Sequence, residues 1–302
     1  MRNFLRKTVL FLLVVVVLDI LFGFVMGNIL DNTQKGDWGR NNYIFDEVKA
    51  DAIILGSSRA IHHYNPVVIS DSLGMSCYNC GEDGMGILLM YARYCAIRER
   101  NIPKVVIYEV LPEYDLQAER DNQKYLKFLR PYSDIPAIDS LICSISSTEK
   151  YKLLSQMYRY NSVFVDIVAQ RFSKASETAA TYTYSPLDKN MNYEPVAASY
   201  GSHITCDSMK LAYMEELIKQ CRNDETYLIF TASPIYRPAS DAPFTPLKQL
   251  CEKYGVPFVK HYCDTTFCNK RVFFADASHL NKTGAETFSE VAAGEIKSII
   301  YK

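Results

Sequence analysis

The stretch Ala50-Asp51-Ala52-Ile53-Ile54-Leu55-Gly56-Ser57-Ser58-Arg59-Ala60 decides the fold of this chain. Its short apolar run lies between charged residues and a turn of small residues, which is typical of a buried strand. Gly56 is expected to end the strand, and Ser57 or Ser58 to begin the next helix. A serine there lies at the carboxyl end of a strand, beside backbone N–H groups that have no intrahelical partner. It is either a helix N-cap or a nucleophile next to an oxyanion site, and this stretch alone leaves both interpretations open.

Short apolar runs alternate with amphipathic segments along the rest of the chain. Further strands are predicted over residues 75–80, 104–110, 226–231 and 256–259. Helices are predicted over residues 66–73, 87–100 and 246–254 and from Thr283 onward, where Thr283 and Glu286 have capping-box spacing. Strands that alternate with helices predict an α/β fold with a mostly parallel five-stranded sheet covered on both faces.

The amino-terminal residues predict a membrane-spanning helix. Arg2, Arg6 and Lys7 precede an apolar run, residues 9–26, that only Asp19 and Gly23 interrupt. The run is about long enough to cross the hydrocarbon core, and the basic flank predicts a cytoplasmic amino terminus with the rest of the chain outside. A cleavable signal peptide is the alternative, although no clear cleavage site follows the run. A carboxylate is costly in lipid, so Asp19 is expected to face a partner helix or to be neutral.

Composition limits what the rest of the chain does. With 302 residues and 48% apolar side chains, the chain can bury one substantial core and an inserted subdomain. A net charge of -1 argues against binding of nucleic acid over the whole surface. We expect an anchor over residues 1–30, a linker over 31–49 and one domain over 50–302, with an insertion at about residues 116–205.

The expected insertion is rich in tyrosine, and the whole chain is rich in cysteine. The tyrosines are expected either to stack on sugar rings or to pack the insertion onto the core. Nine cysteines outside the cytoplasm would be expected to form some disulfides, although the Cys77/Cys80 and Cys263/Cys268 spacings do not establish any. No metal-binding pattern of cysteine and histidine is present, so neither a metal nor a cofactor is expected.

A second chemical motif lies near the carboxyl terminus. In Asp276-Ala277-Ser278-His279, the spacing allows the carboxylate to orient the imidazole while His279 faces a nucleophile from another strand. The adjacent residues His62 and His63 point in different directions on any regular backbone. They are expected to lie at the surface or to support the site from behind.

Together these motifs resemble the SGNH (GDSL-like) hydrolase family. Gly56-Ser57-Ser58 occupies the place of the family's Gly-Asp-Ser block, which makes Ser58 the nucleophile. Residues 79–84, Asn-Cys-Gly-Glu-Asp-Gly, resemble the second block, whose glycine N–H joins that of Ser58 in the oxyanion hole. Gly84 takes this role in the resemblance, with Gly81 as the alternative, and Asp276 and His279 match the last block. The resemblance implies a flavodoxin-like three-layer sandwich and a Ser-His-Asp triad.

One sequence block differs from the pattern of the family. After the third strand the family has Gly-x-Asn-Asp, whose Asn completes the oxyanion hole, whereas this chain has Val-Leu-Pro-Glu-Tyr-Asp over residues 110–115. Asn161 is a substitute to test for that role. Arg59, next to the nucleophile, is expected either to recognise an anionic group of the substrate or to lie on a helix surface.

The departure, the anchor and the Gly-Ser-Ser-Arg turn are similar to those of anchored SGNH-like proteins that acylate extracellular polysaccharides or teichoic acids. This resemblance implies an acyltransferase or esterase of envelope glycans, with an acyl donor, a glycan acceptor, the membrane and envelope assembly proteins as partners. A non-catalytic scaffold that binds polysaccharide or an envelope protein is the alternative, which the missing Asn-Asp block favours.

Overall fold

The computed structural model describes residues 1–118, 122–173, 178, 180, 183–195 and 205–301. The chain divides into two compact units. The N-terminal unit comprises Met1–Glu47 and Asp121–Tyr182, and the α/β unit comprises Val48–Arg120 and Thr183–Lys302. Each unit is described by itself below.

The α/β unit is built on a single parallel sheet. Its strands are β1 (Ala52–Gly56), β2 (Cys77–Asn79), β3 (Val105–Glu109), β4 (Tyr227–Ala232) and β5 (Phe258–Lys260). They are ordered β2-β1-β3-β4-β5, and every neighbouring pair is parallel. This is the flavodoxin-like strand order. The predicted α/β fold with five parallel strands is therefore confirmed.

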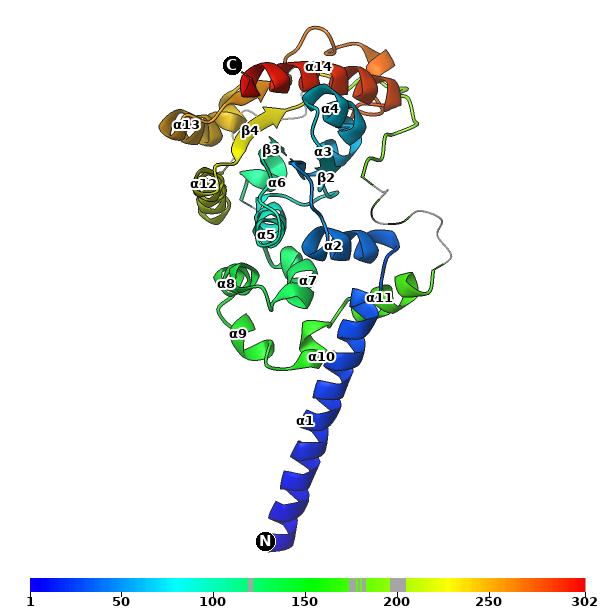
Figure 1. Ribbon diagram of the computed structural model, residues 1–302, viewed down its shortest axis with the longest axis vertical. Coiled ribbons are helices and arrows are strands. Elements are labelled where there is room, and N and C mark those ends of the chain that lie inside the picture. Colours follow the sequence, from blue (N-terminus) through cyan, green and yellow to red (C-terminus); the bar gives the residue numbers. More distant parts are fainter. Residues whose placement is uncertain (119–121, 174–177, 179, 181–182, 196–204, 302) are drawn as a thin grey trace. The chain divides into compact units, whose positions relative to one another are not determined.

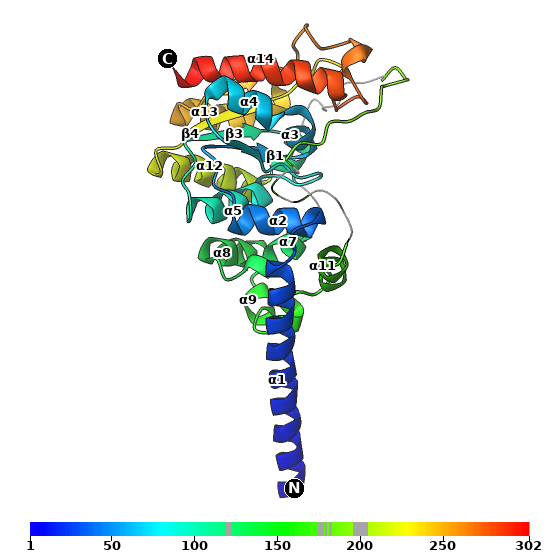
Figure 2. The same cartoon turned by 45° about the vertical axis from the view of Figure 1, so that its right-hand side comes forward.

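Helices cover both faces of the sheet (Figure 2). One layer holds α3 (Ser58–His63), α4 (Pro66–Leu73) and α14 (Lys282–Ile300), and the other holds α5 (Ile87–Arg98) and α12 (Ser208–Asn223). Helix α13 (Thr245–Tyr254) packs against α12, and the short α6 (Pro112–Asp115) follows β3. Three-residue 3-10 helices lie at Ala242–Phe244 and Arg271–Phe273. Because both faces are covered, β1 and β3 are buried along their whole length, as their continuous apolar sequences require.

One predicted helix start was wrong. The capping box assigned to Thr283 and Glu286 is not the cap of α14, because Asn281 is the N-cap and its side chain accepts a hydrogen bond from the Gly284 N–H. Asparagine is among the preferred N-cap residues. The helix therefore begins at Lys282, and its N-cap lies two residues before Thr283. The last helix itself and its place in the fold are as predicted.

The strand register fixes where the site lies. Gly56, the last residue of β1, is the partner of Glu109, the last residue of β3. The carboxyl ends of the two central strands therefore lie level at the same edge of the sheet. In open parallel sheets the residues that follow the strands at this edge form the binding crevice.

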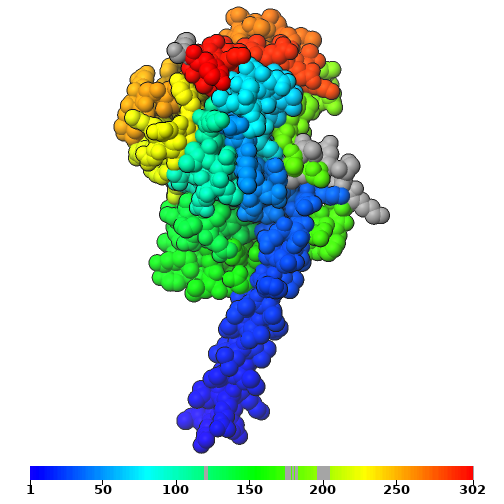
Figure 3. Space-filling model, in the orientation of Figure 1, coloured from blue at the N-terminus to red at the C-terminus, as the bar shows by residue number. Residues whose placement is uncertain are grey.

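The N-terminal unit is helical (Figure 1). It contains α1 (Arg2–Asp31), α2 (Gly36–Asp46), α7 (Leu126–Leu129), α8 (Pro136–Ile145), α9 (Glu149–Lys152), α10 (Gln156–Arg159) and α11 (Phe164–Arg171), with 3-10 helices at Asn122–Tyr125 and Arg130–Tyr132. The predicted linker thus contains α2, and much of the predicted insertion belongs to this unit. Helix α1 is long and apolar enough to cross a membrane, and the side chains of its first half are exposed (Figure 3).

The tyrosines of the predicted insertion are divided between core and surface. Tyr125, Tyr132 and Tyr160 are buried, whereas Tyr151 and Tyr193 are exposed. Tyr182 and Tyr200 lie outside the described residues. The buried rings support packing as the role of that part of the set, and sugar stacking by the exposed rings stays a prediction.

All nine cysteines lie within the described residues, and each is a free thiol. The expectation that some of them pair is therefore not met in this structure. Burial raises the pKa of the Cys95 and Cys268 thiols to about 11, and such a shift is typical of unreactive core cysteines.

Candidate active site

The turn after β1 brings the chain against the end of β3. Gly56 has a φ of +138°, and a Cβ at this position would lie 2.4 Å from the Glu109 carbonyl oxygen. Only glycine fits such a backbone angle in so close a contact. Ser58 follows as the first residue of α3, so its N–H is one of those without an intrahelical acceptor.

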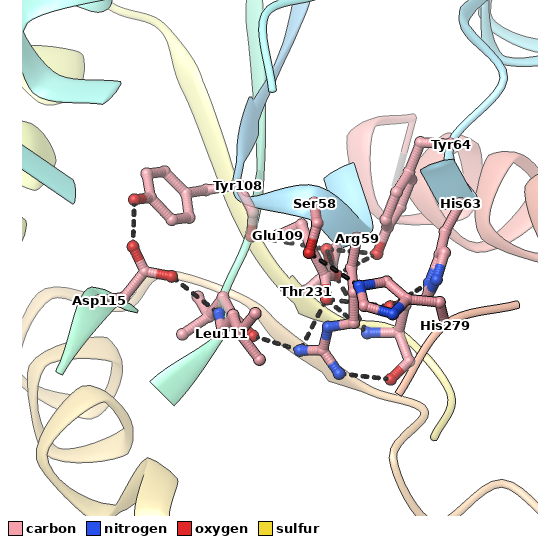
Figure 4. Close-up of polar contacts among 12 residues, drawn as sticks. Ser58, Arg59, His63, Tyr64, Tyr108, Glu109, Leu111, Asp115, Thr231 and His279 are labelled. Carbon is pink, nitrogen blue, oxygen red and sulfur yellow. Dashed lines mark hydrogen bonds and ion pairs between the residues drawn. The ribbon is translucent and has the colours of Figure 1, made fainter. Parts of the chain in front are cut away.

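Ser58, His279 and Asp276 form a connected hydrogen-bonded row, part of which Figure 4 shows. The Ser58 Oγ lies 2.9 Å from the His279 Nε2, and the His279 Nδ1 lies 2.9 Å from the Asp276 Oδ1. A carboxylate only accepts hydrogen bonds, so the neutral imidazole carries its proton on Nδ1 and accepts from the serine hydroxyl at Nε2. This is the arrangement of a nucleophile, its general base and the group that orients the base.

Asp276 is held in the ionised form. Burial opposes ionisation, but hydrogen bonds from the His279 ring and from the Ser278 N–H outweigh it and hold the Asp276 pKa below its ordinary value. The Lys189 ammonium lies 3.2 Å from the Asp276 Oδ2 and adds to the same effect. The ionised Asp276 carboxylate therefore remains next to the ring of His279, the general base.

The structure distinguishes the two adjacent serines. Ser58 is partly exposed and faces the imidazole, whereas Ser57 is fully buried. Within the described residues, the Ser57 Oγ has no hydrogen-bond partner. Of the two hydroxyls, only that of Ser58 is therefore placed to act as a nucleophile with His279.

Arg59 does not face a substrate, and this corrects the prediction that it recognises an anionic group. Its side chain is completely buried, and its guanidinium lies 2.9 Å from the Glu109 carboxylate. It also donates a hydrogen bond of 2.7 Å to the Val110 carbonyl oxygen. A helix-surface position is excluded by the same burial. Arg59 instead ties the start of α3 to the end of β3.

Glu109 is the centre of a buried polar network behind the site (Figure 4). Besides the Arg59 ion pair, its carboxylate accepts hydrogen bonds from the Tyr64 hydroxyl at 2.6 Å and from the Ser233 Oγ at 3.0 Å. The Ser233 N–H and the Thr231 hydroxyl also donate to it. A buried carboxylate is stable only when its oxygens are satisfied in this way.

His63 extends this network to the loop that carries His279. Its Nε2 accepts a hydrogen bond of 2.9 Å from the Leu280 N–H, so its Nδ1 carries the proton and donates to the Ser233 Oγ at 2.7 Å. Burial lowers the His63 pKa, which keeps the ring neutral and its Nε2 able to accept. The nucleophile turn, the ends of β3 and β4 and the base loop are thus joined by side chains.

His62 lies on the open side of the same turn. Its ring centroid is 5.9 Å from that of His279, and its Nε2 lies 3.1 Å from the Asp83 Oδ1. Burial opposes protonation, but Asp83 and the Ser185 carbonyl oxygen outweigh it and raise the His62 pKa. Of the two predicted alternatives, burial of both histidines excludes the surface, and their ring centroids lie 5.9 Å and 6.0 Å from that of His279, as expected for residues that support the site.

The residues predicted for the oxyanion hole belong to different units: Gly81 and Gly84 to the α/β unit, and Asn161 to the N-terminal unit. Gly84 has a φ of +69° in the loop that contains Asp83, and the Gly81 N–H already donates to the Asn79 Oδ1 at 2.9 Å. The oxyanion role of Gly84, with Gly81 as its alternative, stays a prediction. Asn161 is exposed in a turn of the N-terminal unit, whereas Ser58 belongs to the α/β unit, so the oxyanion role of Asn161 stays a prediction.

The segment after β3 is held by a buried carboxyl. The Asp115 Oδ2 accepts a 2.7 Å hydrogen bond from the Leu111 N–H, and its Oδ1 accepts one of 2.7 Å from the Tyr108 hydroxyl. Burial raises the pKa of Asp115 to about 7, although both hydrogen bonds act in the opposite direction. Among the described residues, no group of three or more histidine, cysteine, aspartate or glutamate side chains is placed to hold a metal ion.

Sequence reasoning missed Glu109 and Ser233, and it left His63 open between a surface position and support of the site. One signal was present, since Glu109 is an acid at the end of a run that is otherwise apolar and fully buried. A charge in a buried parallel strand requires a partner, and Arg59 was within reach of the same sheet edge. Nothing local marked His63 or Ser233, because their partners lie more than 100 residues away.

Comparisons with known proteins find only remote similarity. No family model matches the sequence, and no curated protein matches it. Among solved structures, the chain is similar to a candidate acylhydrolase from Bacteroides fragilis NCTC 9343, with 9% identity, a TM-score of 0.40, and coverage of 83% of this chain and 88% of that one. It is also similar to a GDSL-like lipase from Bacteroides thetaiotaomicron VPI-5482, with 9% identity, a TM-score of 0.37, and coverage of 82% and 88%.

Proposed function

We propose that this protein is a membrane-anchored serine acyltransferase or esterase that acts on acyl groups of extracellular polysaccharide. The observation that carries the proposal is the unbroken row from Ser58 through His279 to Asp276, with both hydrogen bonds at 2.9 Å. The resemblance of the sequence blocks to SGNH hydrolases supports the same reaction class. The apolar helix α1 supports the anchor, and its basic flank supports an extracytoplasmic position for the catalytic unit.

In the first half-reaction the Ser58 Oγ attacks the carbonyl carbon of an ester or thioester. His279 takes the hydroxyl proton at Nε2 as the new oxygen–carbon bond forms, and Asp276 stabilises the resulting imidazolium. The N–H groups of Ser58 and Gly84 donate to the oxyanion of the tetrahedral intermediate. When the intermediate collapses, the leaving alcohol or thiol takes the proton from His279, and an acyl-Ser58 ester remains.

In the second half-reaction His279 acts as a base again. It takes a proton from water or from a sugar hydroxyl, whose oxygen attacks the acyl carbon. When the tetrahedral intermediate collapses, the protonated His279 returns the proton to the departing Ser58 Oγ. Water gives a free acid, and a sugar hydroxyl gives an acylated glycan. Transfer requires that an acceptor be positioned so that it reacts faster than water.

The test of this function is covalent labelling of the full chain with a fluorophosphonate, read as a mass shift. The wild type is expected to gain one adduct, and Ser58→Ala none. Ser57→Ala is the matched control: it should keep the adduct, because the Ser57 hydroxyl is buried away from His279. His279→Ala should slow labelling by about 100-fold or more through loss of the general base. Labelling that persists in Ser58→Ala and disappears in Ser57→Ala would reverse the assignment.

Transfer and hydrolysis are separated by the fate of the acyl group. The purified protein is incubated with an activated acyl ester and increasing concentrations of an envelope oligosaccharide. Transfer requires acylated sugar to accumulate at the expense of free acid, and both Ser58 and His279 to be needed. Free acid as the sole product with every glycan tried would favour an esterase.

A non-catalytic scaffold is favoured by the segment after β3. Its Leu111 N–H and Val110 carbonyl oxygen are bound by Asp115 and Arg59, so this part of the backbone serves the fold. The labelling experiment discriminates between the two functions. A scaffold predicts no Ser58 adduct at any probe concentration in a correctly folded wild-type protein.

A further inference from the structure

The apolar run of α1 is interrupted by an acid that the structure pairs within the N-terminal unit. The Asp19 carboxylate accepts hydrogen bonds from the Ser155 Oγ at 2.7 Å, from the Gln156 N–H at 2.8 Å and from the Met157 N–H at 2.9 Å. Gly23, one turn further along α1, gives room for the Gln156 side chain, since a Cβ there would lie 2.5 Å from it. Helix α10 therefore packs directly against α1.

The position of this contact along α1 determines its depth in a membrane. Lys7 is the last basic residue before the apolar run, and the twelve residues from Lys7 to Asp19 span about 18 Å of helix. The hydrocarbon core of a bilayer is about 30 Å thick. With Lys7 at the inner interface, Asp19 and the start of α10 thus lie short of the outer interface, at the depth of the acyl chains.

The bonding of this contact suits a position without water. Inside a bilayer every backbone donor and every charged oxygen must find a partner in the protein. The two amides at the start of α10 have no intrahelical acceptor, and Asp19 satisfies both of them while they satisfy Asp19. Neither the Asp19 carboxylate nor these two amides therefore needs a hydrogen bond from water.

The side chains around this contact are apolar and uncovered. Leu154, beside the Asp19 contact, is 80% exposed, and Val165 on α11 is 61% exposed. We define the collar surface by the exposed large apolar residues of α9, α10, α11 and their flanks: Tyr151, Leu154, Met157, Phe164, Val165 and Phe172. Exposed charged residues such as Lys152 also lie between them. Phe164 also contacts Phe22 of α1 at a ring-centroid distance of 6.3 Å, which keeps α11 beside the same helix.

Charged residues at the border of this surface set its depth. Lys150 and Arg171 lie over the rings of Tyr151 and Phe172, each next to an exposed aromatic side chain. Asp166 on α11 is exposed to solvent. Aromatic rings flanked by basic residues are typical of the membrane–water interface, where long cationic side chains reach the headgroups.

We propose that the collar surface is embedded in the outer leaflet around α1, so that a lipid bilayer covers it. The protein is then held by one crossing helix and by a ring of short helices that enter the acyl region. The proposal rests on the proposed membrane anchor and is independent of the acyl-transfer chemistry. The helix length, the depth of Asp19 and the exposed apolar side chains all require the same occupant, which is lipid.

The test uses tryptophan quenching by phospholipids brominated on their acyl chains, with the full chain reconstituted in phosphatidylcholine vesicles. The wild type contains only Trp38, so its emission gives the background to be subtracted. Leu154→Trp and Val165→Trp report on the collar surface. Leu13→Trp reports on the crossing helix, and Val67→Trp, at a position 63% exposed in the α/β unit, is the matched control.

The added tryptophans in L154W and V165W are expected to emit at short wavelength and to lose most of their emission in brominated vesicles, as L13W does. V67W should emit as a water-exposed tryptophan and stay unquenched. Quenching of L13W without quenching of L154W and V165W would overturn the collar while leaving the anchor. Loss of quenching in all of them would overturn the anchor as well. A collar tryptophan that is shielded from water but unquenched would assign the surface to a protein partner instead of lipid.

Discussion

Glu109 is a completely buried carboxylate, and its ion pair with Arg59 is equally buried. Removing one member of a buried pair leaves the other charge uncompensated, which costs about 3–5 kcal/mol. Glu109→Gln is therefore expected to lower the free energy of unfolding by about 3 kcal/mol, with Arg59 keeping its bond to the Val110 carbonyl oxygen.

The measurement is the thermal unfolding midpoint of the full chain in detergent, followed by circular dichroism. Glu113→Gln is the control, because Glu113 is an exposed acid four residues further along the chain. It should leave the midpoint unchanged. Equal midpoints for the two variants would show that the Arg59–Glu109 pair does not hold the turn.

Asp115 predicts a specific pH dependence of stability. Burial raises the pKa of Asp115 in the folded protein to about 7, above its ordinary value of 3.8, so between these values the folded state keeps a proton that the unfolded chain has lost. The free energy of unfolding therefore falls as the pH rises from about 4 to about 7, by up to about 4 kcal/mol from this group. Asp115→Asn cannot titrate, so it should lose this part of the pH dependence.

This prediction is checked by unfolding curves of the wild type and the Asp115→Asn variant at a series of pH values. Asp71→Asn serves as the control, since Asp71 is exposed on α4. The control should follow the wild-type curve. The idea fails if Asp115→Asn also follows it.

At the scale of elements, the turn between β1 and α3 depends on Gly56. Gly56→Ala places a Cβ 2.4 Å from the Glu109 carbonyl oxygen at a φ of +138°. We expect it to lower the free energy of unfolding by about 2–4 kcal/mol, from backbone strain and overpacking together. It should also slow labelling of Ser58, since the serine follows the same turn.

Gly294→Ala is the matched substitution in α14. A Cβ at Gly294 meets no atom within 4 Å, and the residue lies inside a helix. Alanine there should raise the free energy of unfolding by about 1 kcal/mol. Similar effects of the two substitutions on the unfolding midpoint would contradict the steric account of Gly56.

At the scale of the whole molecule, α1 and its basic flank predict the orientation of the chain. Arg2, Arg6 and Lys7 should stay in the cytoplasm, which places the residues after the membrane-spanning part of α1 outside. Protease added to intact spheroplasts is expected to digest the α/β unit and leave only a fragment that contains α1. A cytoplasmic protein in the same spheroplasts is the control for integrity. Protection of the α/β unit until lysis would place it on the cytoplasmic side.

Much of this architecture follows from the sequence because it depends on local rules. Alternation of apolar runs with amphipathic segments predicted all five strands, and Gly74 and Gly255, each just after a predicted helix, end these helices in the left-handed conformation that glycine adopts readily. The contact between Asp276 and His279 was predictable too, since the two residues are three apart in one loop. The apolar run of α1 is equally local.

The tertiary structure alone decided which distant side chains meet. Ser58 and His279 are 221 positions apart, and only the strand order and register bring them within a hydrogen bond. The same holds for Arg59, which the sequence placed either towards a substrate or on a helix surface, and which the fold pairs with Glu109.

The sequence by itself thus determined the five strands, the turn at Gly56 and the apolar helix. Each of these rests on backbone sterics and hydrophobic periodicity within a few residues. The buried network behind the site and the pairing of Asp19 with α10 were decided by the tertiary structure. A buried charge must find a partner, but which partner it finds depends on packing between segments that are far apart in the chain.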